Sequence, residues 1–260
     1  MTLMELLIVI SIIGILTLIA LPGVKGMKQS NVMNAANRQL LDDLALARQM
    51  AIKNRSEVSI VFAPLIDPAT MAPPVDSRTM QAEDPEPLIL GQLTSYRLFA
   101  RRTVGDQPGR PTERYLTGWK ELPDGVFVAK EKFIVQPQAA PQPPQSVTLN
   151  LPLENRTITT FGLAKFPYPT STNGALATLA YMTFDPQGRV AAQDATLDGR
   201  VIIPLVRGGM LHTPNPTGKG HLWEEVDARE NPQYSQTNNY NFIVIDALTG
   251  RARVERPEIQ

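Results

Sequence analysis

Residues 1–24 read MTLMELLIVISIIGILTLIALPGV, an apolar run with a single carboxylate, Glu5, near its start. No charged side chain occurs between positions 6 and 24. A helix over this stretch, at about 1.5 Å per residue, is roughly 30 Å long, which matches the hydrocarbon core of a bilayer. The run therefore predicts a hydrophobic helix segment that crosses a membrane or forms the core of an assembly.

Glu5 needs a positively charged partner in such surroundings. An ionised side chain costs about 2.5 to 3.5 kcal/mol at the centre of a membrane helix. The nearest cation in the sequence is the α-amino group of Met1, and the two groups meet better between neighbouring chains than within one helix. We therefore expect Glu5 to pair with the N-terminal amine of an adjacent copy. The run lacks the basic start and cleavage pattern of a secretory signal peptide, whereas a plain single-span anchor stays open.

Gly14 and Pro22 predict a weak point in the helix. Proline removes one helical hydrogen bond, and glycine lowers the cost of leaving the helix. Unwinding between the two positions and a simple kink at Pro22 both fit this pattern.

Residues 25–55 continue as an amphipathic helix, because Ala36, Leu40, Leu44 and Ala47 recur every three or four positions. Residues 56–260 are expected to form a β-rich globular domain with proline-rich loops at 64–87 and 135–145. The predicted fold class is α+β, with a long N-terminal α-helical spine packed on an antiparallel β-sheet. Strands are predicted at 58–63, 88–102, 178–184, 200–206, 242–246 and 251–256.

The segment TLMELLIV at 2–9, with IIGIL at 12–16 and Pro22, resembles the mature N-terminus of type IV pilins and type II secretion pseudopilins. The resemblance implies the pilin fold, cleavage by a prepilin peptidase and N-methylation of the first residue. The register of Glu5 favours Met1 as that processed residue, and an initiator methionine is the alternative. The implied site residues are Met1 for processing and N-methylation, Met1, Thr2, Leu3 and Glu5 for subunit assembly, and Gly14 and Pro22 for helix melting.

Three further segments narrow the resemblance. TFDPQGRV at 183–190 and FIVIDALTGRARV at 242–254 resemble the C-terminal hairpins of FimT/GspH-type pseudopilins, and LARQMAIKNRSEV at 46–58 is similar to their helix end. Positions 64–175 carry no such likeness.

The resemblance implies a structural subunit of an extracellular or periplasmic type IV pilus-like filament. The alternative is a minor pseudopilin of a type II secretion system or of a pilus priming complex. The implied partners are copies of the same chain, forming a helical filament through residues 1–24, together with the prepilin peptidase and an inner-membrane assembly platform. The chain is then expected in the inner membrane before assembly, and afterwards in an extracellular filament or a periplasmic pseudopilus.

Composition and motifs give no sign of catalysis. The chain has 260 residues with 25 acidic and 25 basic side chains, and this balance does not indicate a nucleic-acid partner. It contains no cysteine, which excludes thiol chemistry. His212 and His221 stand nine positions apart without a metalloprotease or nucleophile motif, and Asp185, Asp194 and Asp198 lack the spacing of a calcium loop. We expect no enzyme activity, no cofactor and no metal. A tethered enzyme would require a convergent polar pocket.

Overall fold

The structure is a computed structural model of the chain. It describes residues 3–69, 71–75, 83–103, 105–107, 109, 112–133, 143–150, 155–168, 174–191, 194–196, 198–230 and 240–256. The side chains of residues 8, 14–30, 150 and 155 are outside this description.

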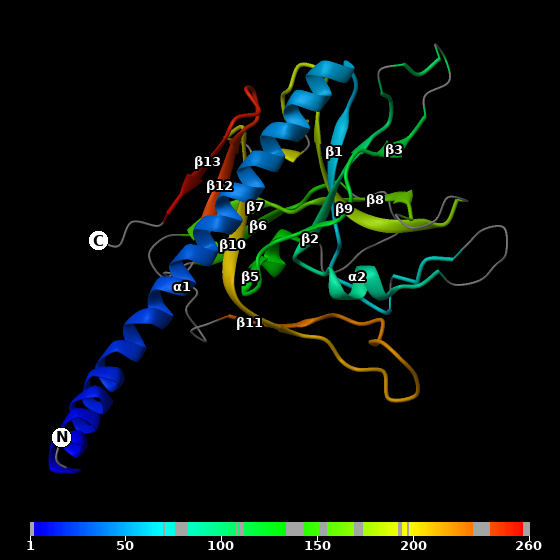
Figure 1. Cartoon of the computed structure of the whole chain (residues 1–260). Helices are drawn as coiled ribbons and strands as arrows, with labels where there is room; N and C mark the ends of the chain where they lie inside the picture. The colour runs from blue at the N-terminus through cyan, green and yellow to red at the C-terminus, as the bar shows by residue number, and fades with distance from the viewer. Residues whose placement is uncertain are drawn as a thin grey trace.

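Helix α1 (Leu3–Asn54) is the first element and projects from the rest of the molecule at its N-terminal end (Figure 1). Its C-terminal half carries the predicted apolar stripe, and Ala36, Leu40, Leu44 and Ala47 are fully buried. From Leu3 to Met33, the first buried residue described, a helix of this length rises about 45 Å. Among the residues whose side chains are described, buried positions of α1 therefore occur only in its second half.

The described strands form three sheets in which every pairing is antiparallel. The six-stranded sheet has the order β3-β2-β1-β9-β8 with β4 paired to β2, the five-stranded sheet has the order β11-β10-β12-β13 with β5 paired to β10, and β6 pairs with β7. The strand bounds are β1 Val58–Phe62, β2 Ser95–Ala100, β3 Arg114–Tyr115, β4 Lys120–Glu121, β5 Val126–Val128, β6 Ser146–Asn150, β7 Asn155–Thr159, β8 Gly162–Pro167, β9 Leu176–Phe184, β10 Arg200–Leu211, β11 Asp227–Glu230, β12 Asn241–Asp246 and β13 Ala252–Glu255; the short helices are α2 Glu86–Leu90 and the 3-10 turn Lys130–Lys132.

Helix α1 contacts both of the larger sheets, β1 and β9 in one and β5, β12 and β13 in the other. Successive side chains of a strand point to opposite faces. In β1, Val58, Ile60 and Phe62 join the core under α1, whereas Val61 belongs to a second core on the opposite face. The six-stranded sheet is thus covered on both faces, and all five residues of β1 are buried for that reason.

The predicted α+β pilin fold, with a helical spine packed on one antiparallel sheet, was wrong. The structure is mostly β, its strands lie in three sheets, and the six-stranded sheet carries a second core on the face away from the helix. The difference from the predicted fold arises in the middle of the chain. There β3 to β8 form strands that the polar, proline-rich sequence did not predict.

Several local predictions can be checked directly. The strands expected at 58–63, 178–184, 200–206, 242–246 and 251–256 are confirmed by β1, β9, β10, β12 and β13. The strand expected at 88–102 was partly wrong, because residues 86–90 form α2 and only Ser95–Ala100 is extended. The proline-rich stretch 135–145 falls largely outside the described residues.

The membrane prediction requires a correction. Within the described part of the chain, no helix combines the length and the apolar character needed to cross a membrane. The predicted transmembrane segment at 1–24 and the predicted inner-membrane localisation were therefore wrong.

Candidate functional site

The N-terminal end of α1 carries the largest set of exposed apolar side chains among the described residues. The eight are Leu3, Met4, Leu6, Leu7, Val9, Ile10, Ile12 and Ile13, with exposed fractions between 45% and 83%. They occupy every side of the helix, since consecutive pairs recur along three turns. An isolated surface leucine is ordinary, but a contiguous patch of this kind marks an interaction site.

Glu5 lies within this patch as the acidic residue of the first helical turn. A carboxylate there is favoured by the unpaired backbone N–H groups of the helix start. Leu3 and Glu5 are exposed, as the predicted assembly role requires, whereas Met1 and Thr2 lie outside the described residues. The structure therefore brings Leu3 and Glu5 into one surface, and the predicted roles of Met1 and Thr2 stay predictions.

The predicted melting site shows no break. Helix α1 is continuous through Gly14 and Pro22, although their side chains are outside the description. Unwinding in an assembled state is thus a prediction that an isolated chain does not test.

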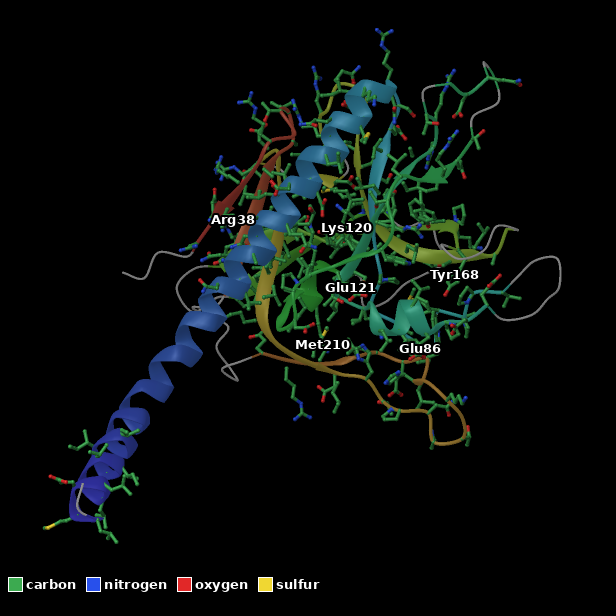
Figure 2. The ribbon with its side chains drawn as sticks, viewed as in Figure 1. Arg38, Glu86, Lys120, Glu121, Tyr168 and Met210 are labelled. Atoms are coloured by element: carbon green, nitrogen blue, oxygen red, sulfur yellow. The ribbon has the colours of Figure 1, made fainter. Side chains whose placement is uncertain are left out.

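A buried polar cluster joins α1 to the six-stranded sheet. Asp43 is only 5% exposed and accepts a hydrogen bond from Tyr96 Oη at 2.6 Å. Lys120 Nζ binds the other carboxylate oxygen, and Gln39 Nε2 donates to Tyr96 Oη at 3.1 Å and to the Glu121 carbonyl at 2.8 Å. Figure 2 shows Lys120 and Glu121 on the side of the body that faces α1. This cluster fixes the angle at which the helix leaves the body.

Arg48 connects the three segments that carry the pseudopilin resemblance. Its Nε donates to the Gly188 carbonyl at 3.2 Å and to the Thr249 carbonyl at 2.8 Å. Gly188 closes the turn after β9, and Thr249 lies in the turn after β12. The end of the helix and two hairpin turns therefore meet at one guanidinium, which the sequence could not show.

A second candidate cluster joins the two histidines, which both lie in the connection between β10 and β11. Their ring centroids are 5.7 Å apart. Glu86 at the start of α2 accepts the His221 backbone N–H at 3.1 Å, and its other oxygen lies 2.6 Å from His221 Nδ1. No sequence pattern indicates this partner, because Glu86 and His221 are 135 positions apart.

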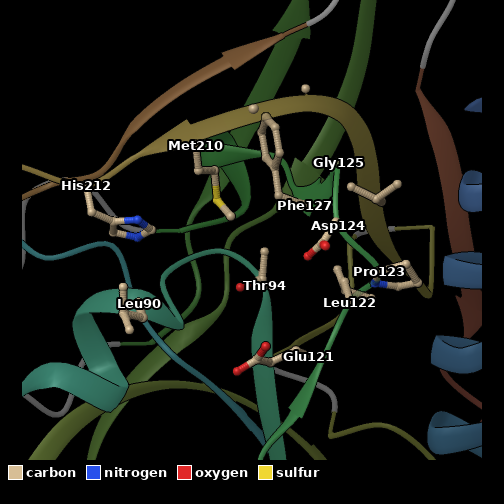
Figure 3. A pocket seen from close by; sticks show the side chains of 13 residues that line it. Leu90, Thr94, Glu121, Leu122, Pro123, Asp124, Gly125, Phe127, Met210 and His212 are labelled. Carbon is tan, nitrogen blue, oxygen red and sulfur yellow. The ribbon is translucent and has the colours of Figure 1, made fainter.

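Beside His212 lies a cavity of about 240 Å³ between α2, the β4–β5 connection and β10 (Figure 3). Met210 and Asp124 point into it, and Leu90 and His212 lie on the side opposite Asp124. Its wall mixes apolar side chains with the carboxylates of Glu121 and Asp124. No nucleophile paired with a base lines it, so its side chains offer no catalytic arrangement among the described residues.

The remaining aspartates divide between turns and the interior. Asp185 Oδ1 accepts the backbone N–H groups of Gln187 and Arg189 at 2.9 and 2.8 Å, as expected for a turn residue. Asp194 is buried, and desolvation raises its pKa to about 6. Among the described residues, no group of three or more histidine, aspartate or glutamate side chains could hold a metal ion.

Comparison with known proteins adds no relative. No family model matches the chain, and neither a curated protein nor a solved structure matches it.

Proposed function

We propose that the chain is a structural subunit that polymerises into a type IV pilus-like filament through its N-terminal segment. The observation that supports this proposal is the apolar surface of residues 3–13, which nothing in the described part of the molecule covers. The resemblance of residues 2–9 to the pilin N-terminus agrees with it.

The energetics favour assembly of many copies over a simple dimer. Fully burying an exposed leucine or isoleucine is worth about 1.5 to 3 kcal/mol. Since the eight side chains are roughly half to four-fifths exposed, complete coverage contributes on the order of 10 kcal/mol. One neighbour covers only one side of a helix and must offset an association cost of about 4 to 15 kcal/mol. A bundle of several N-terminal segments covers all sides, and a helical filament provides that environment for every subunit.

Glu5 sets the register in this assembly. A carboxylate surrounded by apolar side chains is strongly unfavourable unless a cation pairs with it. The N-terminal amine of an adjacent copy is the cation nearest in sequence, and only one axial offset between two helices brings the groups together. Glu5 therefore contributes direction and spacing, whereas the apolar residues contribute the driving force.

The proposal is tested with Glu5→Gln, which retains shape and hydrogen bonding but removes the charge. The matched control is Asp42→Asn, at an exposed position of the same helix within the body-bound half. We expect wild-type protein and Asp42→Asn to form sedimenting filaments visible by negative-stain electron microscopy, and Glu5→Gln to remain soluble with an unchanged circular dichroism spectrum. Equal filament yield from Glu5→Gln would overturn the register mechanism, and wild-type protein that stays monomeric at every concentration would overturn the filament itself.

A minor subunit of such a filament is the second candidate. It is favoured by the meeting of the pseudopilin-like segments at Arg48. The share of this chain in filaments isolated from the producing cells separates the two, because a major subunit dominates the preparation and a minor one is a trace component.

A further inference from the structure

The two histidines of the chain are the only strong ligands for borderline metals in a sequence without cysteine. They are brought together by a turn in which the Asn215 N–H donates to the Gly220 carbonyl at 2.9 Å, beside a bridge between Pro214 and His221. Outside this turn, each ring is held by a different part of α2. The local turn therefore brings the two rings together, and long-range contacts with α2 orient them.

Each ring has one nitrogen oriented by an oxygen acceptor. The Glu86 carboxylate holds His221 at Nδ1, and the backbone carbonyl of Ile89 accepts a hydrogen bond from the His212 ring. His212 Nε2 is buried and has no hydrogen-bond partner in the described structure. A buried imidazole nitrogen without a partner is costly, so this atom is prepared for a ligand that the protein alone does not supply.

The position of Glu86 depends on a glycine. Gly220 has a φ of +86°, and a Cβ at this position would lie 2.6 Å from Glu86 Oε2. A side chain there would be strained and would push the carboxylate away from His221. The lack of a side chain at Gly220 thus leaves room for the Glu86 carboxylate beside the turn.

From this arrangement we propose that His212 and His221 bind one Zn²⁺ ion through their Nε2 atoms, with Glu86 orienting His221 from behind. A carboxylate that accepts the second N–H of a metal-bound histidine is the usual outer partner of such ligands. Glu86 also supplies a negative charge that offsets the charge of the ion.

The spacing of the rings agrees with a shared ion. With a Zn–N bond of about 2.0 to 2.1 Å, the ion lies about 3.2 Å from each ring centre. The two ring centres are 5.7 Å apart, which is within the separation of about 6.4 Å that two such distances allow, so one ion can reach both rings. The remaining positions go to water, so the site is weaker than a structural site with four protein ligands.

The type of ligand atom decides which metal ion this site would take. Imidazole nitrogen favours zinc, nickel and copper, whereas Mg²⁺ and Ca²⁺ prefer oxygen ligands.

The test is calorimetric titration of the full-length chain, prepared without a histidine tag, with ZnCl₂ at neutral pH. We expect one Zn²⁺ per chain, a loss of at least about tenfold in affinity for His212→Gln or His221→Gln, and a loss of about 10- to 100-fold for Glu86→Gln. MgCl₂ is expected to give no binding. Asp124→Asn, which changes a nearby cavity carboxylate, is the matched control and should bind as wild type does.

Two results would overturn the proposal. One is the absence of Zn²⁺ binding by the wild-type chain. The other is unchanged affinity in both histidine variants, which would assign the ion to surface carboxylates. Circular dichroism of each variant identifies a folding defect, and X-ray absorption at the zinc edge of the wild-type complex gives an independent check by counting two imidazole nitrogens.

Discussion

Replacing Asp43 with alanine is expected to destabilise the folded chain by about 2 to 3 kcal/mol. The side chain is buried, and Tyr96, which is 1% exposed, donates its hydroxyl hydrogen to Asp43 at 2.6 Å. Without the carboxylate, that hydroxyl has no acceptor, and an unsatisfied buried donor costs about 1 to 3 kcal/mol. Lys120 adds less, because its side chain is 36% exposed and can turn to water.

Urea unfolding of Asp43→Ala, Tyr96→Phe and the double variant measures the contact directly. A hydrogen bond to a charged group predicts a coupling energy of about 1.5 to 3 kcal/mol. Tyr96→Phe retains the ring that packs on Phe62, so it removes only the hydroxyl. The neighbouring Asp42→Asn is the control, since Asp42 is exposed, and it should change stability by less than about 0.5 kcal/mol. A coupling energy near zero, or an Asp43→Ala variant as stable as Asp42→Asn, would refute the reasoning.

Two further predictions concern buried groups and a turn. Burial lowers the pKa of Lys132 to about 7, so between pH 10.5 and about 7 the unfolded chain binds a proton that the folded chain does not, and stability falls as the pH decreases through this window. Lys132→Met is expected to abolish this decline, which thermal melts across pH 7 to 10 would show, and a wild-type stability constant over that range would contradict the cause. Gly250→Ala is expected to cost more than about 2 kcal/mol, because the residue has a φ of +63° and the new Cβ would lie 1.9 Å from the Gly188 carbonyl oxygen. Gly118→Ala, which meets no atom within 4 Å, is the control in chemical unfolding, and equal stability of the two variants would refute the clash.

Local sequence patterns were reliable where apolar periodicity was strong. The apolar stripe of residues 32–51 and the β-branched runs of β1, β10 and β12 identify their elements because burial on one or both faces selects those residues. The turn residues Asp185 and Asp246 likewise predict reversals, since their carboxylates accept nearby backbone N–H groups.

Long-range features had no comparable signal. The strand predicted from Leu88 missed α2, whose start is marked by Pro87 and Pro85 rather than by its apolar residues. Glu86 shows no relation to His221 in the sequence, because tertiary contacts bring them together. The sequence likewise does not show that Lys132 is buried, because a charged side chain alone predicts a residue at the surface.

The two bonds of Arg48 have a consequence for the order of folding. They close loops of 140 and 201 positions, and the entropy of closing such loops delays contacts of this range relative to local ones. During synthesis from the N-terminus, Thr249 leaves the ribosome 201 positions after Arg48. The C-terminal end of α1 therefore cannot make both contacts until the turn after β12 has been synthesised, although the helix is made before every strand that it packs against.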